Sequence, residues 1–243
     1  MSIHSTFEGA GFTADALNIA QDNGISLRIG TCFSEYADIV SMGRPHQPVG
    51  RPFDFRHNDF DPTNGFWIVG RNEKGELVHS QALRLVNLEG KPLSSYLSDR
   101  FVDFPPPGID LDYKKSRYNP GPSARRISGT VGYHGDFWLS SDYRGTGMCN
   151  ILARFALASG LLRWSPDYVI GFMINPIALK GLAEREGYMH SEPGALFWHL
   201  ANSDKVIETF MVWMAREDIN HLQTIPLQGF VRQPAPSIGI AAE

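Results

Sequence analysis

A glycine-rich turn between a predicted strand and a predicted helix is the stretch best suited to chemistry. Residues 137–139 form an apolar run typical of a buried strand, and apolar residues recur at helical spacing from Met148 onward. Between them, Gly145 and Gly147 let the backbone bend tightly and expose its N–H groups. The first N–H groups of a helix lack intrahelical partners and lie at the positive end of its dipole. The turn therefore predicts a phosphate or diphosphate site.

Three glycine-loop patterns can be compared with this turn. A Walker loop needs Lys followed by Ser or Thr after its last glycine, where this chain has Met148-Cys149. A dinucleotide fingerprint needs a third glycine, where this chain has Asn150. The run Arg144-Gly145-Thr146-Gly147-Met148-Cys149 instead resembles the coenzyme A diphosphate loop of the GNAT superfamily of N-acetyltransferases, with Cys149 at its final small position. On this motif alone, a tight turn without a ligand stays an open alternative.

A second motif follows at a suitable distance. Residues 167–174 are apolar and rich in β-formers, which favours a strand. Asn175-Pro176 is typical of an N-cap followed by Pro at the first helical position, and a helix is predicted over 177–186 with Gly187 at its end. This order resembles the strand–Asn–helix–Gly–aromatic segment that follows the diphosphate loop in GNAT proteins.

Composition limits the classes of function. The chain has 243 residues, 42% hydrophobic and 12% aromatic, which is ample for a buried core. Its net charge of −4 argues against general nucleic-acid binding. Two cysteines, Cys32 and Cys149, give no disulfide or zinc framework, and the histidines show no metal-ligand spacing. We find no targeting segment and no apolar run long enough for a bilayer, so we expect a cytoplasmic protein without membrane contact.

The predicted elements run strand, helix, hairpin, insertion, strand, helix, strand, helix and two strands. This order resembles the GNAT order over residues 25–214, with an N-terminal lead at 1–24, an insertion at about 87–126 and a C-terminal extension at 215–243. The resemblance implies an α/β (α+β) fold: a mixed, mostly antiparallel central sheet flanked by helices and splayed at the acyl-CoA site. Strands near the C-terminus are candidates for pairing across a homodimer.

The resemblance implies acetyl-CoA or another acyl-CoA as cosubstrate, and no metal. Backbone N–H groups would anchor the diphosphate, Arg144 would add charge, and a strand edge would pair with the pantetheine arm and polarise the thioester. The predicted cofactor-binding residues are Trp138, Leu139, Ser140, Arg144, Gly145, Thr146, Gly147, Met148, Cys149, Asn150 and Asn175.

Proton transfer is less clear from the sequence. GNAT enzymes often carry a Tyr acid four residues before the glycine of the second motif, where this chain has Leu182-Ala183. The catalytic candidates are Asp136, His134 and Tyr133, on the strand before the turn. Strand alternation predicts His134 and Asp136 on one face and Tyr133 on the other. For each of the three, a hydrogen-bonded strand residue without a catalytic role is the competing interpretation.

The leading hypothesis is an acyl-CoA-dependent N-acyltransferase that passes acetyl from acetyl-CoA directly to a small-molecule or peptide amine. One alternative is a non-catalytic acyl-CoA sensor or partner module. Another is a transferase for a longer acyl donor, admitted by the insertion. Trp67 and Trp198 are candidates for lining an acceptor pocket. Cys149 has the position of a nucleophile at a helix N-terminus, but its place in the loop favours a packing role.

Overall fold

The fold is built on one eight-stranded sheet with the strand order β1-β2-β3-β5-β6-β8-β7-β4. The structure is a computed structural model that describes residues 3–231. Its strands are Ser26–Gly30 (β1), Gly65–Arg71 (β2), Leu77–Asn87 (β3), Leu111–Tyr118 (β4), Thr130–Leu139 (β5), Tyr168–Ile174 (β6), His190–Leu200 (β7) and Val206–Ala215 (β8).

Neighbouring strands are antiparallel except β5 and β6, which are parallel. That pair is in register only from Val131 opposite Tyr168 to Tyr133 opposite Ile170. Both strands continue beyond this point, so they diverge toward their carboxyl ends and open the sheet near its middle. The mixed, mostly antiparallel sheet and its flanking helices confirm the fold class that the GNAT resemblance implied.

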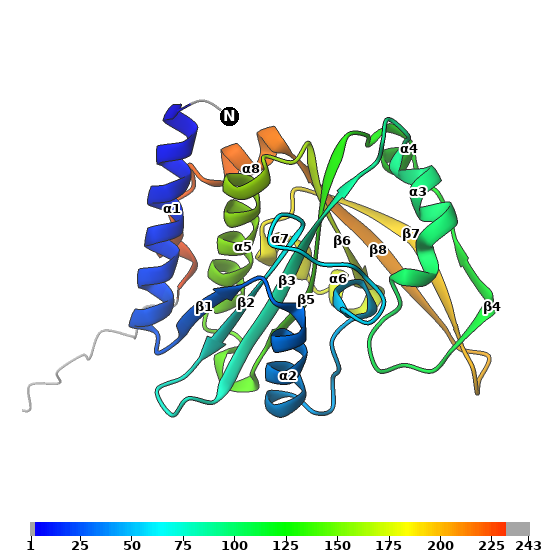
Figure 1. The fold of residues 1–243 in the computed structure, drawn as a ribbon, viewed down its shortest axis with the longest axis horizontal. Helices are drawn as coiled ribbons and strands as arrows, with labels where there is room; N and C mark the ends of the chain where they lie inside the picture. The colour runs from blue at the N-terminus through cyan, green and yellow to red at the C-terminus, as the bar shows by residue number, and fades with distance from the viewer. Residues whose placement is uncertain (1–2, 232–243) are drawn as a thin grey trace, which may run out of the picture.

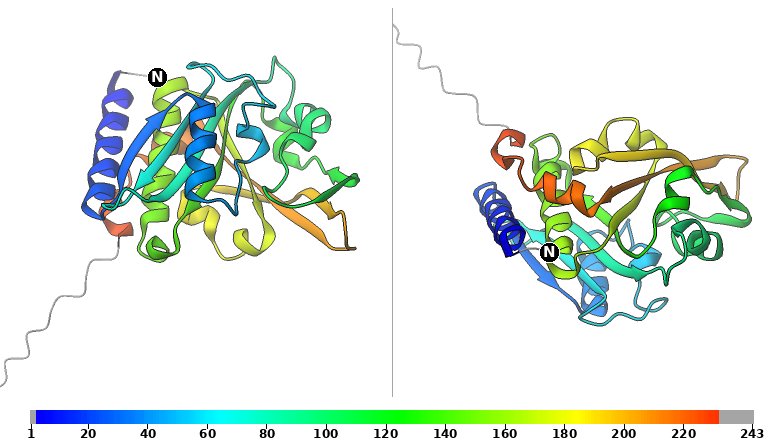
Figure 2. Two further views of the ribbon diagram at one scale, coloured as in Figure 1. Left: turned by 60° about the horizontal axis from the view of Figure 1, so that its bottom comes forward. Right: turned by 90° about the horizontal axis from the view of Figure 1, so that it is seen from above.

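Helices cover both faces of the sheet (Figure 1). α1 and α5 lie side by side on one face, where they share an apolar core with β2 and β3 (Figure 2). α2 packs on the opposite face of the same strands, and α7 and α8 join α5 over β6 and β8. The helices are Ile3–Asp22 (α1), Phe33–Gly43 (α2), Leu93–Arg100 (α3), Pro122–Arg126 (α4), Met148–Trp164 (α5), Asn175–Ala178 (α6), Leu182–Glu186 (α7) and Arg216–Leu222 (α8).

The N-terminal helix is longer than the sequence indicates. In the sequence, Thr13 is a candidate cap for a helix over 14–22, whereas α1 begins at Ile3 and continues through Gly9 and Gly11. A side chain at Gly9 would press on Leu162 of α5, so the glycine permits a close helix–helix approach that offsets its poor helix propensity. Tertiary packing thus overrides the local signal.

The segment predicted as an insertion carries its own elements. It contributes α3, α4 and β4, and β4 pairs with β7 at one edge of the sheet. The C-terminal strands β7 and β8 therefore lie inside the sheet, and the expectation that they offer free edges for a dimer is wrong. Homodimerisation itself and the division at 25–214 stay predictions.

The helix predicted over 177–186 is interrupted. Gly181 takes a left-handed φ of 73° and separates α6 from α7. After α8, the short turn Leu227–Phe230 returns to α5, and the rest of the predicted C-terminal extension, 232–243, lies outside the described residues. Within 3–231, no helix has the length and apolarity that crossing a bilayer requires.

Candidate active site

The glycine turn has the predicted geometry between a strand and a helix. A short helical turn, Ser141–Tyr143, follows β5, and α5 begins at Met148 directly after Gly147. Gly145 and Gly147 have φ of 79° and 98°, a region that favours glycine. A Cβ on Gly147 would overlap the carbonyl oxygen of Phe230, whereas one on Gly145 would meet nothing within 4 Å. Gly147 is thus required by packing and by conformation, and Gly145 by conformation alone.

The side chains of the turn mostly stabilise the turn itself. Thr146 Oγ1 donates to the carbonyl of Tyr143 at 2.7 Å, and Asn150 Nδ2 donates to the carbonyl of Gly147 at 3.3 Å. Arg144 is exposed, and its Nε donates to the carbonyl of Leu139 at 3.0 Å. The remaining guanidinium nitrogens of Arg144 have no partner in the described part of the chain, so they are free for an anion.

Cys149 is a packing residue in this turn. Burial raises the pKa of its thiol to about 12, so the thiolate is scarce at neutral pH. The neighbouring Met148 is fully buried in the core beneath α5. The nucleophile alternative for Cys149 therefore gains no support.

A buried arginine, Arg154, holds the flank of the turn. Arg154 Nη1 donates to the carbonyl of Arg185 at 2.5 Å, and its guanidinium lies 4.2 Å from the ring centre of Phe230. The same residue donates to the carbonyl of Glu184 at 3.3 Å. Arg154 thereby joins α5, the end of α7 and the C-terminal turn around the start of α5.

A bulge in β5 rearranges the catalytic candidates. Ala82 pairs with Gly135 but Ser80 pairs with Trp138, so β5 carries one extra residue, and Asp136 takes a left-handed φ of 55°. Tyr133 and Asp136 consequently share the face that carries α2, and His134 lies on the face that carries α5. The predicted alternation, which paired His134 with Asp136, is wrong because a bulge shifts the pleat by one residue.

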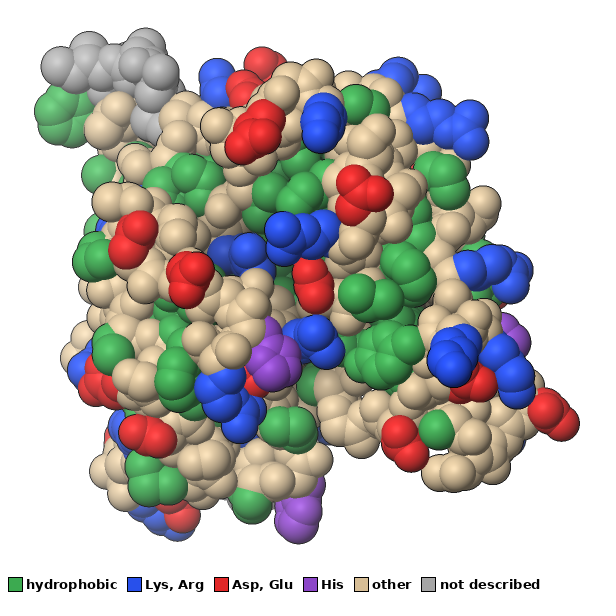
Figure 3. Space-filling view, turned by 45° about the vertical axis from the view of Figure 1, so that its right-hand side comes forward, with side chains coloured by type: hydrophobic (Ala, Val, Ile, Leu, Met, Phe, Trp, Pro, Cys, Tyr) green, Lys and Arg blue, Asp and Glu red, His purple; other side chains and the backbone are tan. Residues whose placement is uncertain are grey.

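A cavity of about 320 Å³ lies where β5 and β6 diverge and reaches both faces of the sheet. We call its two parts the α2 half, lined by Gly50, Phe53, Phe104, Tyr133, Asp136 and Trp198, and the α7 half, lined by His134, Leu182, Glu186, Tyr188 and Val212. Figure 3 shows hydrophobic side chains gathered near the middle of one face of the molecule, among charged ones. Trp198 lines the cavity as expected, whereas Trp67 is a core residue whose indole N–H donates to the carbonyl of Cys32.

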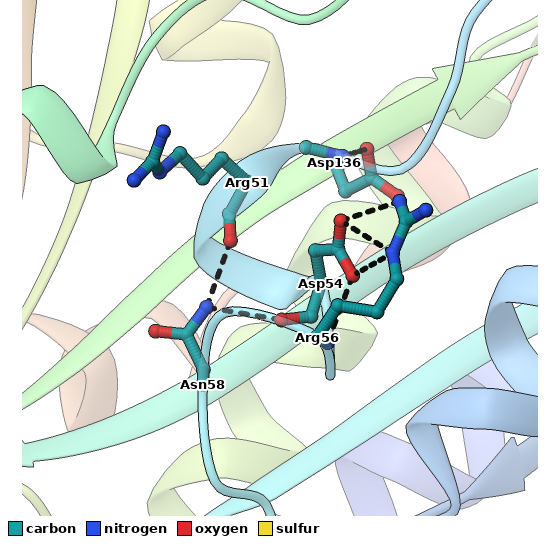
Figure 4. Close-up of polar contacts among 6 residues, drawn as sticks. Arg51, Asp54, Arg56, Asn58 and Asp136 are labelled. Carbon is teal, nitrogen blue, oxygen red and sulfur yellow. Dashed lines mark hydrogen bonds and ion pairs between the residues drawn. The ribbon is translucent and has the colours of Figure 1, made fainter.

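Asp136 is held in a closed polar network. Its Oδ2 accepts from the hydroxyl of Tyr36 at 2.6 Å and from Arg44, and its Oδ1 accepts from the backbone N–H of Gly50 at 3.1 Å. The side chains of Arg44 and Asp136 are 2% and 0% exposed. Asp136 lies beside the helical turn that contains Arg51, and the side-chain amide of Asn58 donates to the carbonyl of Arg51 (Figure 4). The carboxylate therefore ties the bulge to α2 and to the segment between α2 and β2 that contains Gly50.

Tyr133 presents a hydroxyl without a partner among residues 3–231. Its ring packs between Phe53, at a centroid distance of 5.5 Å, and Phe104, at 4.8 Å. Burial raises the pKa of Tyr133 above its ordinary value, so the hydroxyl keeps its proton at neutral pH. Of the three catalytic candidates, Tyr133 alone has its polar group uncommitted.

His134 belongs to a buried chain of hydrogen bonds whose proton positions can be assigned. Gln81 Nε2 lies 2.7 Å from the carbonyl of Leu152, and a carbonyl can only accept, so Gln81 turns its Oε1 toward His134 Nε2 at 2.9 Å. Burial lowers the pKa of His134 to about 4, so the ring is neutral and carries its proton on Nε2. Tyr188 then donates its hydroxyl proton to His134 Nδ1 at 2.9 Å. The lone pairs of Tyr188 remain for the cavity.

Glu186 is a cavity residue that the sequence analysis missed. Its residue is 3% exposed, and no hydrogen bond or ion pair reaches its carboxyl from the described residues. Burial raises its pKa to about 8. The available signal was a carboxyl residue at the end of the predicted helix, directly before Gly187-Tyr188, where an apolar residue would pack more easily.

Some polar groups of the residues predicted to bind the cofactor are already hydrogen-bonded, and others are not. Trp138 offers its carbonyl to His79 Nδ1 at 2.7 Å, and Ser140 donates its backbone N–H to the carbonyl of Val78 at 2.8 Å. Asn175 does not cap a helix with its side chain, because α6 begins at Asn175 itself. Its Oδ1 is buried and unpartnered, which leaves an acceptor beside the splayed strands. In residues 3–231, no group of three or more His, Cys, Asp or Glu side chains is arranged to hold a metal.

Among known proteins, this chain is similar to several solved structures. No family model matches the chain, and no curated protein matches it by sequence. Similar solved structures include NAA60 of Arabidopsis thaliana with a bisubstrate analogue, at 14% identity and a TM-score of 0.46 over 79% of this chain and 97% of that one. FeeM, an N-acyl amino acid synthase from uncultured soil microbes, matches at 10% identity and 0.48 over 83% and 98%. The spermidine/spermine N-acetyltransferase SpeG of Vibrio cholerae matches at 8% and 0.45 over 82% and 98%.

Proposed function

We propose that this chain is an acyl-CoA-dependent N-acyltransferase, acting most simply with acetyl-CoA. One observation carries the proposal: the glycine turn at the start of α5 lies beside a splayed parallel pair whose gap opens into a cavity reaching both faces of the sheet. The turn suits a diphosphate, and the gap suits a narrow arm that carries a thioester through the sheet. A donor entering from the α7 half and an amine from the α2 half would meet at the bulge.

The reaction in this arrangement is direct acyl transfer. The amine nitrogen attacks the thioester carbonyl, the carbon–sulfur bond breaks, the thiolate leaves and the amine proton passes to a base or to water. The predicted group of Tyr133, His134 and Asp136 surrounds the bulge, and we retain it as the catalytic proposal. Within it, the free hydroxyl of Tyr133 is the best placed to contact the acceptor, since the polar atoms of His134 and Asp136 are already bonded.

Calorimetric titration with acetyl-CoA tests the proposal. We expect binding at sub-millimolar concentration and a loss of about tenfold or more in affinity for Gly145→Asp, which places a negative charge at the diphosphate. Gly75→Asp is the matched control, because Gly75 has the same φ of 79° and equally open surroundings, in the β2–β3 hairpin. No binding by the wild-type chain, or equal affinities for the two variants, would contradict the proposal.

A second candidate function is acyl-CoA binding without turnover. The closed network around Asp136 favours it, because that carboxylate is committed to Arg44 and two further donors. Release of free thiol from acetyl-CoA over a panel of amines separates the two functions. Tight binding with no thiol release for any amine would support the binding module.

A further inference from the structure

The α2 half of the cavity is walled mainly by rings. Phe104 packs edge-on against Tyr133 at 4.8 Å and against Phe172 at 5.7 Å, and Phe53 stacks on Tyr133. Three consecutive prolines, Pro105–Pro107, extend this wall toward the exposed Ile109. Such a surface binds apolar groups favourably, because both surfaces are removed from water.

The charge in this half is already neutralised. Among the cavity-lining residues in the described part of the chain, Asp136 and Glu186 are the acidic ones, and none is Lys or Arg. Asp136 is fully committed to Arg44, Tyr36 and Gly50, and Glu186 lies in the α7 half. An ammonium group entering the α2 half would therefore lose its water without gaining a free carboxylate, which is unfavourable.

We propose that the α2 half selects acceptor amines that carry an apolar aliphatic or aromatic group, and that it rejects amines with a second ammonium group. This proposal rests on the proposed acyltransferase function. The reactive amine would lie at the bulge next to the Tyr133 hydroxyl, and its apolar substituent would lie against Phe53 and Phe104. The same apolar chemistry could belong to a long acyl chain, so the experiment must separate the two sources.

Two amines of equal chain length provide the test: n-hexylamine ends in a methyl group and cadaverine in a second ammonium. With acetyl-CoA as donor, we expect kcat/KM for n-hexylamine to exceed that for cadaverine by about tenfold or more. Ile109→Asp adds a free carboxylate to the wall at a residue that is 37% exposed. This variant should lower the ratio of kcat/KM for n-hexylamine to kcat/KM for cadaverine. Ile29→Asp, at a residue 51% exposed on β1, is the matched control and should leave the ratio unchanged.

The outcomes are distinguishable. If the wild-type chain does not bind acetyl-CoA in a titration, the proposed function fails and the amine result is not needed. If acetyl-CoA binds and cadaverine reacts as well as n-hexylamine, the selection proposal fails alone. If the chain prefers decanoyl-CoA to acetyl-CoA and shows no preference between the amines, the α2 half belongs to the acyl chain, and the acceptor proposal is overturned.

Discussion

The two halves of the cavity hold their carboxyl groups in opposite ways. Asp136, in the α2 half, is buried and accepts hydrogen bonds from three donors, one of which is the guanidinium of Arg44. Glu186, in the α7 half, is equally buried and has no partner in residues 3–231. The first pairs with a guanidinium and holds the bulge to α2, whereas burial raises the pKa of the second to about 8, so that its carboxyl can exchange a proton near neutral pH. Equal burial thus accompanies one carboxylate that is paired and ties elements together and one carboxyl that has no partner among the described residues.

The largest effect is expected from removing the cation beside Asp136. Arg44→Met leaves a buried carboxylate without its guanidinium, which typically costs about 3–5 kcal/mol of unfolding free energy. Urea denaturation measures the loss. Arg28→Met, which breaks the exposed Arg28–Glu35 pair, is the control and should change stability far less. Equal losses would show that the buried Arg44–Asp136 pair stabilises the fold no more than the exposed pair does.

The glycine turn should respond next. Gly147→Ala adds a left-handed alanine and a collision with the Phe230 backbone, together about 2–4 kcal/mol. Gly145→Ala meets no neighbour and carries only the conformational cost, about 1–2 kcal/mol. Thermal unfolding of the two variants checks the order. If Gly145→Ala were the more damaging variant, the packing account of Gly147 would be wrong.

The unpaired carboxyl of Glu186 should make the free energy of unfolding depend on pH. The folded pKa of Glu186, about 8, lies above its ordinary value of 4.5, so the folded chain binds more protons between these values. Its contribution therefore declines as pH rises through this window, by up to about 1.4 kcal/mol per pH unit. The folded pKa of His134, about 4, lies below its ordinary 6.5, so its contribution declines as pH falls from 6.5 to 4.

Between pH 6.5 and 8, Glu186 lowers the stability of the fold as pH rises, and His134 contributes no opposing change in this interval. We expect Glu186→Gln to flatten the decline in this interval, measured by urea unfolding at several pH values. Glu184→Gln, at an exposed carboxyl of the same helix, is the control and should leave the slope intact. An unchanged slope in Glu186→Gln would mean that the carboxyl is paired in solution.

The smallest effect concerns two hydroxyl groups on opposite sides of the sheet. Tyr188→Phe leaves His134 Nδ1 buried without a donor, which should cost about 1–2 kcal/mol. Tyr133→Phe removes a hydroxyl that has no partner among the described residues and should be close to neutral for stability. A reversed order in thermal unfolding would refute the stabilising role of the hydrogen bond between Tyr188 and His134.

Local patterns predicted most of the sheet and the glycine turn, because strand alternation, turn glycines and the amphipathic periodicity are local. These patterns failed at positions whose structure depends on contacts between residues far apart in the sequence. The face of the sheet on which Asp136 lies depends on a bulge opposite Ala82 and Ser80, and the sequence of neither strand alone predicts this bulge. The isolation of Glu186 and the pairing of Asp136 with Arg44, 92 positions away, require the tertiary structure. The break at Gly181 was visible as a glycine, but the rest of that helix outweighed it in the sequence pattern.

The C-terminal turn Leu227–Phe230 has a practical consequence for anyone who shortens this protein. Leu227 is buried in the same core as Met148 and Phe12, so the first helix, the start of α5 and the end of the described chain support one another. A fragment that stops after β8 would retain every strand yet expose the apolar underside of the glycine turn. The smallest unit that folds independently therefore extends beyond the last strand, and expression boundaries should be placed accordingly.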